Sequence, residues 1–357
     1  MLMLPNDLTH RPVARDLLLG PLGIGTGTSR WAQTAVQPDD AQLLDGLRRA
    51  VESGVELIDT ADSHRYGHAE RLIGKILKEN PGHNVRVSST VGRVRGSAPH
   101  PYAGPRLRHQ LEQTLENLYL DELAVYTLES YDFGNGDRYL GPVIEQMRVL
   151  RDLGQIRAIG LRGPDGRSSA RFIRRFLDLF DQIRPNVVWT QASGLLPLAD
   201  LGDGEDLGVF TARRGVGLLV ASPLANGVLA GRRPRTEGLA DDRTDMQTSA
   251  ITHGLAVLSD RFGSSADALL RVALRFILHQ VQNAVVIVGV GDRQQVGRYF
   301  DSLGQPLCAK DLTVIEEVFR RIRSTVSPTE DRSLSGEVTS RDGRAAVPVQ
   351  QGTPLRR

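Results

Sequence analysis

Eight short segments rich in Val, Ile and Leu recur along the chain, and segments with the apolar spacing of amphipathic helices separate them. The eight apolar segments cover residues 22–27, 55–61, 85–90, 123–129, 156–162, 186–191, 217–222 and 284–290. Alternation of strands with helices predicts a parallel sheet, and eight repeats predict that this sheet closes into a (β/α)8 TIM barrel. A length of 357 residues is normal for such a barrel.

The predicted barrel occupies residues 20–323 and follows an N-terminal extension over residues 1–19. A long polar connection without periodicity runs from residue 231 to about 249, where we expect a surface excursion near the seventh strand. Residues 324–357 are rich in Pro, Ser, Gly and Arg and lack a core pattern, which predicts a flexible C-terminal tail.

Composition excludes several classes of function. The chain has 44 basic and 42 acidic residues, a balance that gives no indication of nucleic-acid binding. Cys308 is the only cysteine, so an intramolecular disulfide or a cysteine-based metal site is excluded, and a reducing cytoplasm fits best. Because no segment resembles a signal peptide or reaches membrane-spanning length, we expect a cytoplasmic protein without a membrane anchor that acts on a small molecule.

Polar residues stand at the carboxyl ends of the predicted strands. Asp59, Glu129, Arg162 and Gln191 each follow an apolar segment. In barrels of this type the carboxyl ends of the strands build the active site, whereas the opposite rim serves stability. These residues are therefore expected to converge on one barrel mouth.

The segment "IDTADSHRYGHAERLIGK" over residues 58–75 is unusually rich in titratable residues for a connection between a strand and a helix. His64 suits proton transfer near neutral pH, or it is a loop residue that fills space. His64 and His68 have a spacing that would suit zinc, but Gly67 lies between them and we expect no metal.

Five motifs resemble those of the aldo-keto reductases: "GPLGIGTG", "LIDTAD…YGHAERLIGKIL", "GQIRAIGL", "ASPLANGVLAG" and "ALRFILHQ…AVVIVGVGDRQQV". They occur in the order and spacing of that family from about residue 20 to residue 305. Each motif is weak alone, but the ordered set is specific. The resemblance implies an (α/β)8 barrel that usually binds NADP(H) and reduces carbonyl groups.

The resemblance covers one of the four catalytic residues of the family. That family uses an Asp and a Lys to lower the pKa of a Tyr that donates the proton, and a His that orients the substrate. Asp59 matches the Asp, but His64 aligns with the Tyr, Val91 with the Lys and Glu129 with the His. Tyr66 lies two positions after the expected Tyr, and a tyrosine with an ordinary pKa of about 10 and no nearby ammonium group is a poor acid–base catalyst at neutral pH.

The cofactor positions also depart from the family pattern. The resemblance implies cofactor contacts from Gly25, Ser222, Leu224, Gly289 and Arg293, and we expect substrate contacts from Trp31, Arg162 and Gln191. However, Arg162 and Gly163 replace a Ser-Asn pair that holds the nicotinamide, and Ala221 replaces an aromatic residue that stacks on it. NADP(H) is therefore an expected cofactor whose binding positions are degraded.

These departures lead to three hypotheses. The leading one is redox-neutral acid–base chemistry, such as dehydration, isomerisation or cyclisation, with His64 as acid or base, Asp59 and Glu129 setting its charge, and Arg162 holding an anionic or carbonyl group. The second keeps NADP(H)-dependent reduction of a carbonyl or conjugated C=C bond, with Tyr66 or His64 as proton donor. The third is a scaffold that binds a ligand without catalysis.

Overall fold

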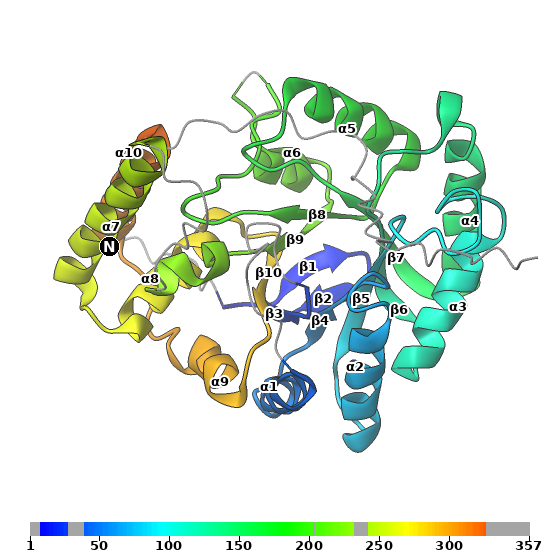
Figure 1. Cartoon of the computed structure of the whole chain (residues 1–357), viewed down its shortest axis with the longest axis horizontal. Helices are drawn as coiled ribbons and strands as arrows, with labels where there is room; N and C mark the ends of the chain where they lie inside the picture. The colour runs from blue at the N-terminus through cyan, green and yellow to red at the C-terminus, as the bar shows by residue number, and fades with distance from the viewer. Residues whose placement is uncertain (1–7, 28–38, 203, 232–241, 326–357) are drawn as a thin grey trace, which may run out of the picture.

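A computed structural model describes residues 8–27, 39–202, 204–231 and 242–325 of the chain. Eight parallel strands of these residues form a closed barrel in the order β10-β3-β4-β5-β6-β7-β8-β9 (Figure 1). Their bounds are β3 (Leu22–Gly25), β4 (Leu57–Asp59), β5 (Arg86–Val91), β6 (Leu123–Leu128), β7 (Ile156–Arg162), β8 (Val187–Gln191), β9 (Gly217–Ala221) and β10 (Ala284–Gly289). The predicted (β/α)8 barrel is confirmed.

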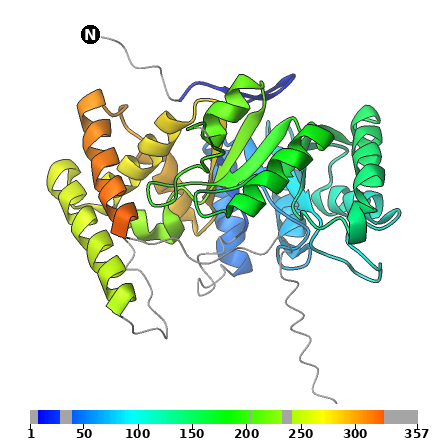
Figure 2. The ribbon, with the colours of Figure 1, turned by 90° about the horizontal axis from the view of Figure 1, so that it is seen from above.

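Helices surround the barrel in the described part of the chain (Figure 1). They are α1 (Asp40–Glu52), α2 (His68–Glu79), α3 (Arg106–Leu118), α4 (Leu140–Asp152), α5 (Ala170–Ile183), α6 (Leu207–Arg213), α7 (Asp242–Phe262), α8 (Ala266–Gln280), α9 (Arg293–Asp301) and α10 (Ala309–Thr325), with 3₁₀ turns η1 (Asn135–Asp137) and η2 (Ala225–Ala230). Helices α7 and α10 lie side by side at one edge of the molecule (Figures 1 and 2).

Short polar side chains fix where several helices begin. An Asp or Ser at the N-cap accepts a hydrogen bond from a backbone N–H of the first turn, which satisfies a donor that the helix itself leaves open. The N-cap residues of this type are Asp39 of α1, Ser169 of α5, Asp206 of α6, Ser265 of α8 and Asp292 of α9.

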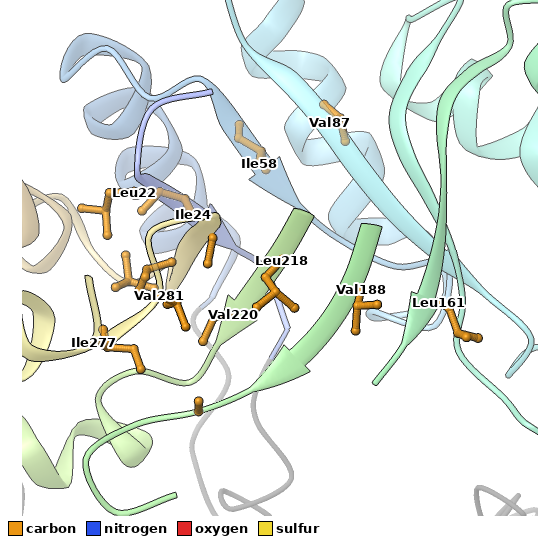
Figure 3. Close-up of a cluster of buried hydrophobic side chains, with 14 of the residues drawn as sticks. Leu22, Ile24, Ile58, Val87, Leu161, Val188, Leu218, Val220, Ile277 and Val281 are labelled. Atoms are coloured by element: carbon orange, nitrogen blue, oxygen red, sulfur yellow. The ribbon is translucent and has the colours of Figure 1, made fainter. Parts of the chain in front are cut away.

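The main hydrophobic core lies between the barrel and its helices. Strand residues such as Ile24, Ile58 and Val188 are fully buried and belong to one cluster with Ile277 of α8 and with Val281 (Figure 3). Burial on both faces explains why the strands appear in the sequence as near-continuous apolar runs.

A hairpin closes the amino-terminal end of the barrel. Strands β1 (Arg11–Ala14) and β2 (Leu17–Leu19) pair antiparallel and lie across this end (Figure 2). Val13, Leu17 and Leu19 are buried against residues from inside the barrel, including Leu57 and Leu219. The hairpin approaches β9 so closely that a Cβ on Gly217 would lie 2.1 Å from the carbonyl oxygen of Val13. The interior is therefore sealed at this end.

The segments outside the predicted barrel differ in detail from the expectation. The region predicted as an extension contains the hairpin, whose strands are too short to show periodicity. Helix α7 begins at Asp242, inside the connection predicted over 231–249, and residues 232–241 of that connection lie outside the described part. Helix α10 ends at Thr325, and the remainder of the predicted tail, residues 326–357, also lies outside it. Among the described helices, none combines the length and apolar character needed to cross a bilayer.

Candidate active site

A cavity of about 660 Å³ opens at the carboxyl ends of the barrel strands. Every barrel strand, or the loop that follows it, contributes to the wall. Charged side chains from β4 to β7 line one side, and the loops after β9 and β10 line the other. The volume is in the range of ordinary small-molecule and cofactor sites.

Asp59 ends β4 and lines the cavity while being only 6% exposed. Its Oδ1 accepts a hydrogen bond from Ser88 Oγ at 2.6 Å, and its Oδ2 accepts one from Trp189 Nε1 at 3.1 Å. Burial raises the pKa of Asp59 to about 7 although both hydrogen bonds lower it, and the negative charge of Glu129 raises it further. Asp59 can therefore both donate and accept a proton near neutral pH.

Glu129 follows β6 and is held by two guanidinium groups. Its Oε1 accepts hydrogen bonds from Arg162 Nη1 at 2.5 Å and from Arg93 Nη2. Burial alone would raise the pKa of Glu129, but the charges of Arg162 and Arg93 and a contribution from His64 lower it to about 2. The predicted partner Arg162 is therefore present, and Glu129 stays ionised.

Arg93 was missed by the sequence analysis, which found no cation after the third barrel strand. Val91 is buried at the end of β5, and the chain then turns at Gly92, which has φ = 114°. This conformation is readily available only to glycine, and Arg93 lines the cavity immediately after it. The sequence cue was an arginine directly after a glycine at a strand end.

His64 lies in the loop after β4 and lines the cavity. Its Nδ1 is 3.2 Å from Thr26 Oγ1, which donates a hydrogen bond to Thr60 Oγ1 at 2.8 Å. Burial lowers the pKa of His64 to about 4, with Glu129 opposing this shift and Arg93 adding to it. The imidazole is therefore neutral at pH 7, which does not favour the predicted role of a group that exchanges its proton near neutrality.

Tyr66, predicted as an alternative proton donor, is not brought into the cavity. Its side chain is 87% exposed and does not line the wall. Arg65, Tyr66 and Gly67 all have positive φ values, 53°, 55° and 75°, and this left-handed turn carries Tyr66 to the surface. An inward position for Tyr66 would require a different backbone conformation for the loop.

Two other carboxylates of the same loop region are buried away from the cavity. Asp62 is 4% exposed, and its oxygens have no side-chain hydrogen-bond partner among the described residues. Burial raises the pKa of Asp62 to about 7, and the nearby Glu70 raises it further. Glu70 accepts hydrogen bonds from Ser89, Thr114 and Asn117. Titratable residues in this loop therefore divide between the cavity and the protein interior.

Two of the three predicted substrate contacts reach the cavity. Arg162 lines it and lies over the ring of Trp189, with its Cζ atom 5.9 Å from the ring centroid. Gln191 lines it at the end of β8, and its Oε1 has no hydrogen-bond partner among the described residues. Trp31 lies outside the described residues.

Four of the five predicted cofactor contacts line the cavity, and the fifth does not. Gly25, Ser222, Leu224 and Gly289 line the cavity. Arg293 does not, because its guanidinium forms two hydrogen bonds with the Glu52 carboxylate, at 3.1 and 2.6 Å. Near Arg293, the cavity wall is instead formed by Gly291, Asp292, Gln295 and Tyr299. Among the described residues, no group of three or more His, Cys, Asp or Glu side chains is arranged to hold a metal ion.

Comparisons with known proteins identify the family of this chain. The profile of the aldo/keto reductase family matches residues 21–320. The L-galactose dehydrogenase of Arabidopsis thaliana is 23% identical over 326 residues, which are 88% of this chain and 94% of that protein. The NADH-specific methylglyoxal reductase of Escherichia coli is 24% identical over 328 residues, 85% of this chain and 95% of that protein.

A solved aldo-keto reductase of Bacillus halodurans, in its holo form, has the same fold with a TM-score of 0.64. It is 22% identical to this chain, and the match covers 87% of this chain and 96% of that one. The barrel, the polar residues at its mouth and the match to the family profile over most of the sequence lead to one conclusion. The chain belongs to the aldo/keto reductase family.

Proposed function

We propose that this protein is a nicotinamide-dependent oxidoreductase for a small carbonyl or alcohol substrate, in which Asp59 rather than a tyrosine exchanges the proton. The observation that carries the proposal is a carboxyl group at the cavity wall with a pKa of about 7. A proton-transfer group works best when its pKa lies near the working pH. The relatives described above are named as a dehydrogenase and a reductase, which supports the redox class.

One side of the cavity suits the diphosphate of a dinucleotide. The loop after β9 lines the cavity from Ala221 to Leu224 and again at Asn226 and Gly227, and its residues Ser222, Ala225 and Asn226 have positive φ values of 65°, 45° and 61°. Turns of this kind present backbone N–H groups to an anion. Asp292, the N-cap of α9, lines the same side, but its carboxylate already accepts a hydrogen bond from Gln295 N–H at 2.8 Å, so the diphosphate is expected at the turn after β9 rather than at the start of α9.

A bound dinucleotide would supply or accept the hydride. Ser222, Asn226 and Gly291 would hold its anionic and ribose parts, and Ala221 would face the nicotinamide without an aromatic ring to stack on it. In the reducing direction Asp59 would give its proton to the substrate oxygen, and the resulting carboxylate would be stabilised by the hydroxyl of Ser88 and the indole N–H of Trp189. Neutral His64 would be a hydrogen-bond partner of the substrate.

Redox-neutral acid–base chemistry is the second candidate. It is favoured by Ala221, and by Arg162 and Gly163 at positions where the family resemblance implies groups that hold the nicotinamide. The same carboxyl group, Asp59, would then move a proton within the substrate. In both candidates His64 has a binding role, because its lowered pKa makes it a weak base.

The test is a calorimetric titration of the full chain with NAD+, NADH, NADP+ and NADPH. We expect micromolar binding of at least one pair, followed by oxidation of the reduced form in the presence of small carbonyl compounds. The matched variant Arg293→Ala should bind as tightly as wild type, since Arg293 pairs with Glu52 outside the cavity. Absence of binding for all four dinucleotides would overturn the proposal and favour redox-neutral chemistry.

A further inference from the structure

The mouth of the cavity contains a cluster of two guanidinium groups and one carboxylate. Arg93 and Arg162 both donate to the same oxygen of Glu129, Oε1. The Glu129 and Arg162 side chains are 11% and 12% exposed, whereas the Arg93 side chain is 38% exposed. Two positive charges and one negative charge leave this cluster with a net charge of +1.

The net positive charge of this cluster is not balanced by the neighbouring side chains from β4 and the loop that follows it. His64 is neutral at pH 7, and Asp59 is only partly ionised there. Arg65 also lines the cavity, but it pairs with Asp40 at 2.8 Å. A positive charge in a partly desolvated site favours an anion, because fixed charges act more strongly there than in water.

Donor groups remain for that anion. A guanidinium carries five N–H bonds, and among the described residues Arg93 and Arg162 each use a single nitrogen, for Glu129. The Cζ atom of Arg162 lies 5.9 Å from the centroid of the Trp189 ring, and the backbone oxygen of Arg162 accepts a hydrogen bond from the hydroxyl of Tyr131. Arg162 is therefore held in place, and Arg93 presents its remaining donors at the opening.

We propose that Arg93 and Arg162 bind the carboxylate of a small oxo acid or hydroxy acid. A carboxylate matches the planar fork of an arginine and carries the single negative charge that neutralises the cluster. A phosphate monoester is less suitable because its second charge would be left unbalanced beside Glu129 and Asp59. Trp189 contacts both Arg162 and Asp59, which places Arg162 and the proposed proton donor on the same side of the cavity.

This inference names the substrate class of the proposed function and rests on it, but binding can be tested without hydride transfer. The probe is pyruvate, and methyl pyruvate is the uncharged comparison. Both are titrated calorimetrically into the full chain in the absence and in the presence of the dinucleotide that binds. Wild type should bind pyruvate at least about tenfold more tightly than methyl pyruvate.

Arg93→Gln should reduce pyruvate affinity by about tenfold to a hundredfold and leave methyl pyruvate affinity unchanged. This variant keeps the pair between Arg162 and Glu129. The matched control is Arg95→Gln, which removes the same charge from an exposed residue that does not line the cavity. Arg95→Gln should bind pyruvate as wild type does.

Equal affinity for the acid and the ester, or unchanged pyruvate binding by Arg93→Gln, would overturn the inference. Tighter binding of inorganic phosphate than of pyruvate would also overturn it and would assign the arginines to a phosphate group. Failure of the proposed oxidoreductase function gives a different result: pyruvate binds, but no dinucleotide binds and no reduced dinucleotide is oxidised.

Discussion

The two ends of the barrel are built from opposite kinds of residues. At the amino-terminal end, Val13, Leu17 and Leu19 of the hairpin are buried against apolar residues from inside the barrel. At the carboxyl end, Asp59 and Glu129 face a cavity with arginines beside them. Apolar burial stabilises the folded state directly, whereas buried charges are costly and remain only where partners hold them. The amino-terminal end therefore contributes mainly to stability, whereas the carboxyl end carries the side chains of the candidate active site.

The largest effect is expected at the mouth, from Asp59→Asn. Loss of the ionisable carboxyl group should lower turnover by at least about 100-fold, because Asp59 is the proposed proton donor and its pKa is raised by burial to about 7. Dinucleotide affinity should change little, since the amide keeps the shape of the side chain, and the melting temperature should not fall, because burial of an ionised Asp59 is itself costly. Wild-type turnover by this variant, measured from NAD(P)H absorbance, would show that Asp59 does not transfer the proton.

A substitution in the hairpin at the amino-terminal end should lower stability and leave ligand binding unchanged. Leu19→Ala removes a side chain that is 2% exposed and should lower the free energy of unfolding by about 2–5 kcal/mol, while dinucleotide affinity stays the same. Leu18→Ala is the matched control on the same strand, because Leu18 is 59% exposed and should have almost no effect. Denaturant unfolding measures both. Equal effects of the two variants would contradict the conclusion that the buried face of the hairpin stabilises the barrel.

The smallest effect concerns Asp62, which is as buried as Asp59 but faces no cavity. The pKa of Asp62 is about 7 in the folded protein against an ordinary value of 3.8, so the folded state binds its proton more tightly than the unfolded state does. Its contribution to stability is therefore lost as pH rises from about 4 to about 7. Asp62→Asn should be more stable than wild type by about 1–3 kcal/mol at pH 8, and this gain should shrink toward pH 5.

Glu70→Gln is the control for Asp62→Asn. Burial also raises the pKa of Glu70, but hydrogen bonds from Asn117, Thr114 and Ser89 oppose this shift. Glu70→Gln should therefore gain less stability than Asp62→Asn between pH 5 and pH 8. Both variants are compared by denaturant unfolding at pH 5 and pH 8. A gain for Asp62→Asn that does not depend on pH would refute a raised pKa as the cause.

Many residues that line the cavity at the carboxyl end of the barrel were predictable from the sequence, because strand ends are easy to locate in a regular alternation of strands and helices. Asp59, Glu129, Arg162 and Gln191 line the cavity as expected from their places after apolar runs. The hairpin at the closed end was not predictable in this way. Its two strands have four and three residues, too few for a periodic pattern.

The roles of individual side chains were harder to predict than their positions. Arg93 enters the site because of the backbone turn at Gly92, and Tyr66 leaves it because of three consecutive left-handed residues. Neither conformation follows from the order of apolar and polar residues. The proposal that Asp59 rather than His64 transfers the proton rests on burial, which raises the pKa of an acid and lowers that of a histidine by amounts that depend on the folded structure.

The contact between Gly27 and His64 has a consequence for how the site changes during evolution. A Cβ atom on Gly27 would lie 2.5 Å from His64 Cε1, so any larger residue at position 27 would displace the imidazole. Positions 27 and 64 are therefore expected to vary together among close relatives of this chain. A relative with a smaller residue in place of His64 could carry a larger residue at position 27. A relative that keeps the histidine is expected to keep Gly27 as well.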